Sequence, residues 1–253
     1  MLVYTKDRND RIHEYKSNGA NFYTFGKIAI IVDAGSASGS EIMAGAIQDW
    51  DRGVIIGQST YGKGLVQEQY SLKNGGAMRL TVARYFTPAG RFIQKSYDDE
   101  SNPDTSQYYS LKYNRPLSNQ NGIEPDIAID IPTDCPYLFP EGPAFIAFKM
   151  LKHKNWLSDS GHTAPELVLA LSANELYSTM KNNDSAELNE SDPCVQDYVR
   201  RVKYQMIKLL YNEQTALAKT IGIDPYLKAA IESISQKELF VTSADNSSSP
   251  DKK

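Results

Sequence analysis

The sequence predicts an α/β fold, with a mixed sheet and crossing helices in its first half and a helical region in its second half. Two short apolar runs, 28–32 and 54–56, have the length and composition of buried strands. Between them, apolar residues recur at helical spacing from 42 to 50, and this succession of strand, helix and strand is typical of an α/β sheet. After residue 193, apolar positions recur every three or four residues, which indicates helices.

Other strands of the first half follow from alternating apolar residues bounded by turns. A polar turn between the first two strands predicts a hairpin, and Lys73-Asn74-Gly75-Gly76 predicts a second one. The expected strands are 1–5, 12–15, 64–72, 77–86, 91–94 and 127–131. Residues 95–121 are polar and show no period, so they predict a long loop that could act as a lid.

The stretch 27–67 holds the residues that indicate chemistry. Ser38, with Glu41 three residues on, forms a capping-box pattern at the start of the predicted helix. A serine on a sharp turn between a strand and a helix is well placed for nucleophilic attack, because the N–H groups of a helix start stabilise developing negative charge. Ser36 and Ser40 are better explained as turn and helix residues.

A serine nucleophile needs a base, and this stretch offers a lysine. The three histidines, His13, His153 and His162, all lie outside it. Lys63, between two glycines, is therefore the candidate base. A lysine acts as a base only when its amine is neutral, and burial favours the neutral form, so we expect Lys63 to be buried.

The second half divides into a linker, a helical region and a tail. Prolines punctuate 132–143, helical patterns cover 144–240, and 241–253 is polar and predicted to be disordered. The first expected helix begins at residue 144. Three further helices are expected at 166–181, 193–221 and 226–235. The apolar stripe of the third helix predicts core packing, and a homodimer interface is the alternative.

Cysteine content and charge limit the classes of function. Cys135 and Cys194 form either a structural disulfide in an oxidising compartment or two separate buried thiols. The net charge of −4, without a basic cluster, argues against nucleic acid as the main partner. No stretch approaches the roughly eighteen apolar residues of a membrane span, and the first residues lack a signal-peptide layout.

Four blocks follow one another between residues 27 and 130: GSASGSEIMAGAIQD, VIIGQSTYGKGLVQ, GGAMRLTVARYFTPAGRFIQ and GIEPDI. Their order and spacing resemble those of the carboxyl-terminal processing, or tail-specific, serine peptidases. The resemblance implies a partial ClpP/crotonase-like core and a Ser–Lys dyad that cleaves polypeptides near their C-termini. The nucleophile falls on Ser38, the base on Lys63, and a glutamine that positions the lysine on Gln67.

The resemblance also implies the supporting roles. Gly39 is expected to donate its N–H to the oxyanion. Asp49 falls on an aspartate associated with activity, and we interpret it as structural support, with a salt bridge to Arg52 as one explanation. No metal or cofactor is implied, and an exported, periplasmic or envelope enzyme is expected. We expect residues 1–131 to correspond to the back half of the peptidase domain, because the family's glycine-rich block and PDZ domain do not precede Met1.

Two alternatives remain beside the peptidase. Without the upstream half of the oxyanion hole, the chain could be a non-catalytic module that binds peptides or associates with partners, and we expect weak hydrolysis and self-association. Gly57–Lys63 also fits a P-loop after a strand. Against the P-loop, Gly64 offers no hydroxyl to Mg²⁺, and the next residues lack helical periodicity.

Overall fold

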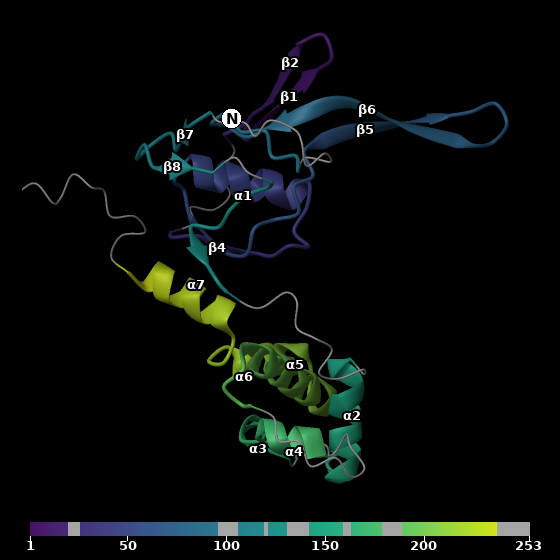
Figure 1. Ribbon diagram of the computed structural model, residues 1–253, viewed down its shortest axis with the longest axis vertical. Coiled ribbons are helices and arrows are strands. Elements are labelled where there is room, and N and C mark those ends of the chain that lie inside the picture. Colours follow the sequence, from purple (N-terminus) through teal and green to yellow (C-terminus); the bar gives the residue numbers. More distant parts are fainter. Residues whose placement is uncertain are drawn as a thin grey trace, which may run out of the picture. The chain divides into compact units, whose positions relative to one another are not determined.

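The computed structural model describes residues 1–19, 26–95, 106–118, 121–130, 142–158, 163–178 and 189–236. Its contacts separate the chain into two units, Met1–Ile129 with Ala229–Lys253, and Asp130–Lys228. The architecture is mixed α/β, as predicted, with the strands in the first unit and most helices in the second (Figure 1). The predicted tail at 241–253 and most of the predicted linker at 132–143 lie outside the described residues.

The first unit contains a parallel sheet of three strands in the order β3-β4-β9. These strands span Ala29–Val32, Val54–Gly57 and Ile127–Ala128. Helix α1, Gly39–Asp49, connects β3 to β4 and shares one apolar core with them (Figure 1). That core contains Val32, Ala44, Ile55, Ile93 and Ile123. The two predicted buried strands and the helix between them are confirmed.

An antiparallel sheet in the same unit has the order β2-β1-β6-β5. β1 covers Val3–Asp7 and β2 covers Ile12–Tyr15, which confirms the predicted hairpin. β5, Leu65–Ser71, and β6, Ala77–Phe86, form a long two-stranded arm (Figure 1). Because β5 begins shortly after Lys63, one end of this arm lies next to the predicted site.

The stretch after β6 differs from the predicted strand at 91–94. A single bridge between Phe86 and Phe92 is formed there. The chain turns at Gly90, which has a φ of 92°, and the N–H of Gly90 donates to the Thr87 carbonyl at 2.9 Å. The turn therefore replaces most of the strand that the apolar residues indicated.

The predicted long loop at 95–121 is partly ordered as strands. β7, Tyr108–Tyr109, pairs antiparallel with β8, Pro116–Leu117. Asp51 holds the turn between them, since its Oδ2 accepts the N–H of Tyr113 at 2.8 Å. This contact comes from a distant part of the chain, so no local pattern indicates it.

The segment Gly122–Asp126, which the sequence identifies only as a turn, is fixed by buried polar contacts. Asp126 Oδ2 accepts the N–H of Ile55 at 2.8 Å, and its Oδ1 accepts Arg115 Nη1 at 2.8 Å. Burial opposes the charge of Arg115, but Asp126 and Asp51 outweigh it and hold the pKa of this guanidinium above its usual value. The segment is thereby anchored to β4.

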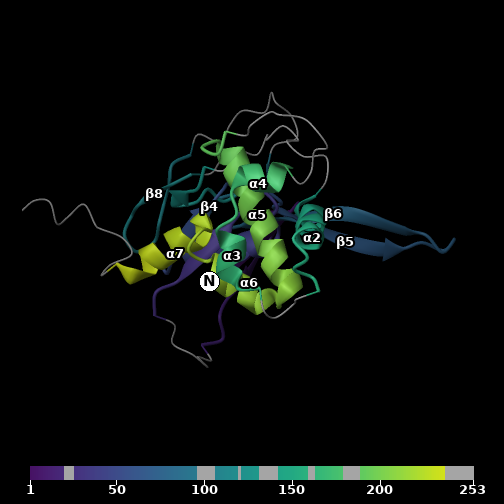
Figure 2. The ribbon, with the colours of Figure 1, turned by 90° about the horizontal axis from the view of Figure 1, so that it is seen from below.

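The second unit is helical, and α5, Pro193–Leu210, is its central element. It contacts α2, Pro143–His153, and the three shorter helices around it (Figures 1 and 2). The shared core contains Ile146, Ala147, Met150, Leu151, Val168, Leu171, Leu176, Val202, Met206, Ile207, Leu210 and Ala216. Core packing of the predicted stripe is confirmed for Val202 and Met206, whereas Leu209 is 49% exposed.

The predicted helix at 166–181 is broken in two. α3 spans Pro165–Leu169 and α4 spans Ala173–Ser178. A second capping box starts α4, because Ser172 Oγ accepts the N–H of Glu175 at 3.1 Å and Glu175 Oε2 accepts the N–H of Ser172 at 2.9 Å. The pattern S-x-x-E was present in the sequence and marks the break.

The predicted helix at 193–221 is also two helices, because α6 starts anew at Glu213–Thr220. Asn212 is its N-cap, and Asn212 Oδ1 accepts the N–H of Thr215 at 2.8 Å. The last helix, α7, Pro225–Ser235, begins as predicted after Asp224. Apolar periodicity runs across the break at Asn212, which is why the sequence indicates one helix.

The structure describes one of the two cysteines. Cys194, at the start of α5, is disulfide-bonded. The one other cysteine of the sequence, Cys135, lies outside the described residues. Disulfides are typical of oxidising compartments, because cytosolic thiols are kept reduced.

Reducing this disulfide is expected to lower the free energy of unfolding of the helical unit by about 2–4 kcal/mol. The two cysteines lie about sixty positions apart, and opening so long a loop restores much conformational freedom to the unfolded chain. Thermal unfolding followed by circular dichroism, with and without a reductant, measures the effect. Serines at both positions should give the lower midpoint in either buffer; an unchanged midpoint on reduction of the native protein would contradict the expectation.

Candidate active site

Ser38 lies on the turn between β3 and α1, in a backbone conformation that few side chains adopt. It is the N-cap of α1, with a φ of 58° and a ψ of −113°. A residue other than glycine in this region is strained, and such strain occurs where surrounding contacts hold a functional group in place. Nucleophilic serines on strained strand-to-helix turns present their hydroxyl in the same way.

Glu41 fixes this turn from inside the protein. Its side chain is fully buried, and its carboxylate accepts four hydrogen bonds. Oε1 accepts Thr60 Oγ1 and the N–H of Gly62, each at 2.6 Å. Oε2 accepts the N–H groups of Ser38 and Lys63, each at 2.8 Å. A carboxylate bonded in this way is compatible with complete burial.

The shared oxygen brings the two predicted catalytic residues together. The N–H groups of Ser38 and Lys63 both donate to Oε2 of Glu41. The distance between the two backbone nitrogens therefore cannot exceed the sum of these two hydrogen-bond lengths. The turn and the lysine loop also meet directly, since the N–H of Tyr61 donates to the Ser36 carbonyl at 2.9 Å. Residues 25 positions apart in sequence (63 − 38) thus share one small region.

Further contacts hold the backbone on the other side of Lys63. The N–H of Gly64 donates to Gln94 Oε1 at 2.9 Å, and the N–H of Lys95 donates to the Gly62 carbonyl at 2.9 Å. Gly62 has a φ of 82°, and a Cβ there would lie 2.8 Å from Lys95 Cβ. Glycine is required at this position both by the backbone angle and by the close approach.

The side chain of Lys63 corrects the expectation of burial, because it is exposed. Gln67, on β5, is exposed as well. Within the described ranges, no hydrogen bond joins the side chains of Ser38 and Lys63, or those of Lys63 and Gln67. The protein therefore fixes the backbone at Lys63 and leaves its amine in contact with solvent. Catalytic hydrogen bonds commonly tighten only when substrate is bound.

Gly39 is exposed and is the first residue of α1. The first N–H groups of a helix have no partner within the helix, and they point outward beside the N-cap residue. An oxyanion formed at Ser38 is a suitable acceptor for such a group. The local geometry is thus compatible with the role expected of Gly39.

Asp49 is buried at the end of α1 and forms an ion pair with Arg91. The distance between Asp49 Oδ1 and Arg91 Nη2 is 2.5 Å, and both side chains are almost completely buried. Asp49 Oδ2 also accepts the N–H of Ala89 at 2.7 Å. The expected salt bridge to Arg52 is thus replaced by Arg91, while Arg52 Nη1 donates to the Gly26 carbonyl.

Three residues hold the site in ways that the sequence does not indicate. The sequence predicts Glu41 only as half of a capping box, and it indicates no role for Thr60 or Gln94. All three lie inside the blocks that carried the resemblance, and all three hold the backbone beside Ser38 or Lys63. The co-occurrence of the blocks was the signal that these positions interact.

The P-loop alternative is not compatible with this geometry. After a P-loop lysine the chain opens a helix, whose N-terminus binds phosphate. After Lys63 the chain enters strand β5. The loop's N–H groups at Gly62, Lys63 and Gly64 are moreover bonded to Glu41 and Gln94.

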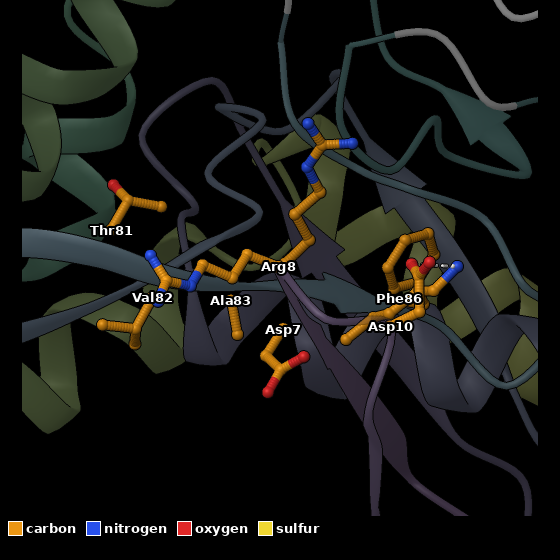
Figure 3. Close-up of a pocket in the computed structure, with 9 residues that line it drawn as sticks. Asp7, Arg8, Asp10, Thr81, Val82, Ala83 and Phe86 are labelled. Atoms are coloured by element: carbon orange, nitrogen blue, oxygen red, sulfur yellow. Dashed lines mark ion pairs between the residues drawn. The ribbon is translucent and has the colours of Figure 1, made fainter.

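A surface pocket of about 370 Å³ is lined mainly by residues of β1 and β6 (Figure 3). Its lining includes Lys6, Asp10, Thr81 and Arg84, and Lys6 pairs with Asp10 at 2.9 Å. None of the predicted site residues line it. It is not the centre that contains Ser38.

The described part of the chain contains no group of three or more His, Cys, Asp or Glu side chains suited to a metal ion. Among the described helices, none is both long and apolar enough to cross a membrane.

One protein-family model matches the first part of this chain. The model of peptidase family S41 matches residues 1–106, which include the Ser38 turn, the Lys63 loop and the β5–β6 arm. Over those residues the chain is similar to members of this family. The S41 segment thus contains every residue that was predicted for the site.

Similar proteins carry names from the same class. A carboxyl-terminal-processing protease of Synechocystis is 39% identical over 94 residues, 37% of this chain and 22% of that protein. A carboxyl-terminal-processing peptidase 2 of the Arabidopsis thaliana chloroplast is 41% identical over 96 residues, 38% and 19% of the two chains. A carboxy-terminal-processing protease of Bartonella bacilliformis is 52% identical over 67 residues, 26% and 15%. The chain thus spans a minor part of these relatives' length.

A solved structure described as the photosystem II D1 C-terminal processing protease is 33% identical, with a TM-score of 0.39. The alignment covers 53% of this chain and 29% of that chain.

Proposed function

We propose that the protein is a serine peptidase of the C-terminal processing type, in which Ser38 and Lys63 form a Ser–Lys dyad. One observation carries the proposal: the N–H groups of Ser38 and Lys63 bind the same buried oxygen of Glu41, on a turn where Ser38 has a positive φ. The match of residues 1–106 to the family S41 model supports the peptidase class. The ClpP/crotonase-like description of its core belongs to this proposal too.

In the proposed reaction, Ser38 Oγ attacks the peptide carbonyl carbon and its proton passes to the neutral Lys63 amine. The carbonyl oxygen becomes an oxyanion that accepts the N–H of Gly39. Lys63 then gives the proton to the leaving amine, the C–N bond breaks, and an acyl-enzyme ester remains. Water hydrolyses the ester with Lys63 again acting as base, and Gln67 orients the lysine amine.

Because Lys63 is exposed, a bound polypeptide can change the surroundings of its amine. Removal of water around an amine favours its neutral form. We infer that the substrate chain covers Lys63 when it enters the site. Catalysis then depends on substrate length as well as on the scissile bond.

The proposal extends to substrate, compartment and assembly. Polypeptides cut near their C-termini are the proposed substrates, supported by the names of the similar proteases in Synechocystis and Arabidopsis thaliana. An exported location is supported by the disulfide at Cys194. A homodimer through the C-terminal helices is supported by Leu217 and Ile221, which are 48% and 40% exposed.

Replacing Lys63 by arginine tests the dyad. Arginine keeps the positive charge but does not deprotonate, so kcat is expected to fall at least about a hundredfold. The assay is hydrolysis of an unstructured peptide by the protein expressed from its complete gene. Lys73→Arg, in the exposed turn of the arm, is the matched control and should leave the rate unchanged.

Retained activity in Lys63→Arg would show that this lysine is not the base. Peptide binding without hydrolysis by the unaltered protein, under every condition, would instead favour the non-catalytic peptide-binding module.

A further inference from the structure

Thr60 lies behind the candidate site, and its hydroxyl is bonded on both sides. The residue is 5% exposed. Its Oγ1 donates to Glu41 Oε1 at 2.6 Å and accepts the N–H of Ile123 at 2.8 Å. The backbone closes the same contact, because the N–H of Thr60 donates to the Ile123 carbonyl at 3.1 Å.

This approach depends on Gly122. Its φ is 109°, and a Cβ at this position would lie 2.7 Å from Thr60 Oγ1 and 2.8 Å from the Thr60 carbonyl oxygen. A side chain at residue 122 would therefore separate Ile123 from Thr60. Because Gly122 has no side chain, the segment Gly122–Asp126 can contact the Thr60 hydroxyl. Asp126 anchors the same segment to β4.

The two bonds define the direction of the hydroxyl proton. A threonine hydroxyl has one proton to donate, and the N–H of Ile123 occupies an acceptor position. The proton is thus directed at Glu41 Oε1, which fixes the rotation of the carboxylate. With Oε1 held by Thr60 and Gly62, Oε2 is turned toward the N–H groups of Ser38 and Lys63.

We propose that Thr60 is a positioning residue for the peptidase reaction: through Glu41 it aligns the backbone at Ser38 with the backbone at Lys63. It touches neither the substrate nor the reacting atoms and acts only through the carboxylate. The segment Gly122–Asp126 is then the outer support of the active site. This inference rests on the proposed function of Ser38 and Lys63.

Thr60→Val tests the proposal, since valine keeps the shape and removes the hydroxyl. Misplacing catalytic groups by about 1 Å can lower the rate about a hundredfold, so kcat is expected to fall about 10- to 100-fold with KM changed less than about twofold. Thr60→Ser restores the hydroxyl and should recover most of kcat. The rate of covalent labelling of Ser38 by a fluorophosphonate should fall and recover in parallel.

Thr87→Val is the matched control for stability. Thr87 is another buried threonine of the first unit, 3% exposed, and its Oγ1 accepts the N–H of Arg91 at 3.3 Å. A similar fall in melting temperature is expected for Thr60→Val and Thr87→Val, with kcat lowered only in the former.

Wild-type kcat in folded Thr60→Val, or failure of Thr60→Ser to recover activity, would overturn the proposal. Failure of the proposed function looks different. In that case the unaltered protein shows no hydrolysis that depends on Ser38 and no labelling of Ser38, whatever residue stands at position 60.

Discussion

Alanine in place of Ser38 is expected to lower kcat by about 10⁴-fold or more, because removal of a peptidase nucleophile leaves only the contributions of binding and the oxyanion site. Ser38 alone among the three serines of its block occupies the positive-φ position at the N-cap of α1. Hydrolysis of an unstructured peptide with an apolar C-terminus, followed by mass spectrometry, measures the loss in protein expressed from its complete gene.

The neighbouring serines provide matched controls. Ser36 Oγ accepts the N–H of Asp33 at 3.1 Å and donates to Asp33 Oδ1 at 3.0 Å, so it stabilises the turn. Ser40 lies exposed in the first turn of α1. Ser36→Ala and Ser40→Ala should keep kcat within about tenfold, an allowance for small shifts of the turn. Wild-type activity in Ser38→Ala would show that the nucleophile lies elsewhere.

Removing the carboxylate of Asp49 is expected to reduce the free energy of unfolding by about 3–5 kcal/mol, because Arg91 is left as a buried charge without its anion. The Arg91 side chain is 1% exposed, and its remaining partners are neutral oxygens of Gln48 and Ser118. Chemical denaturation of Asp49→Ala, followed by circular dichroism, gives the value.

A double variant distinguishes the loss of the ion pair from the loss of the packing of its side chains. Asp49→Ala combined with Arg91→Met removes both charges, so its cost should be smaller than the sum of the two single costs. Additive costs would indicate that the two charges do not stabilise one another. An undiminished unfolding free energy in Asp49→Ala alone would contradict a structural role for this aspartate.

The part of the site that could be predicted is the part with local signals. Ser38 is marked by the apolar run before it, by the helical period after it, and by Glu41 at capping-box spacing. The strands and the helix around it follow from the same patterns and are confirmed. The positive φ at Ser38 has no such signal, because it results from contacts that close around the turn.

The part that could not be predicted depends on contacts between distant residues. The bonds from Glu41 to Thr60, Gly62 and Lys63 cross about twenty positions, and Gln94 reaches Gly64 from thirty positions away. Exposure of Lys63 is likewise set by what packs on the loop. Its glycine neighbours indicate close packing of the backbone, and the structure shows that this packing involves the main chain rather than the amine.

The strained turn at Ser38 sets stability and function against each other. Glycine adopts a φ of 58° with a ψ of −113° without steric cost, whereas other residues pay about 1–3 kcal/mol there. A glycine at position 38 would therefore raise the free energy of unfolding and abolish hydrolysis. Laboratory evolution that selects for expression or heat resistance alone, without a screen for hydrolysis, is expected to replace Ser38 in its first rounds. A thermostable variant of this chain needs its gains made far from the turn between β3 and α1.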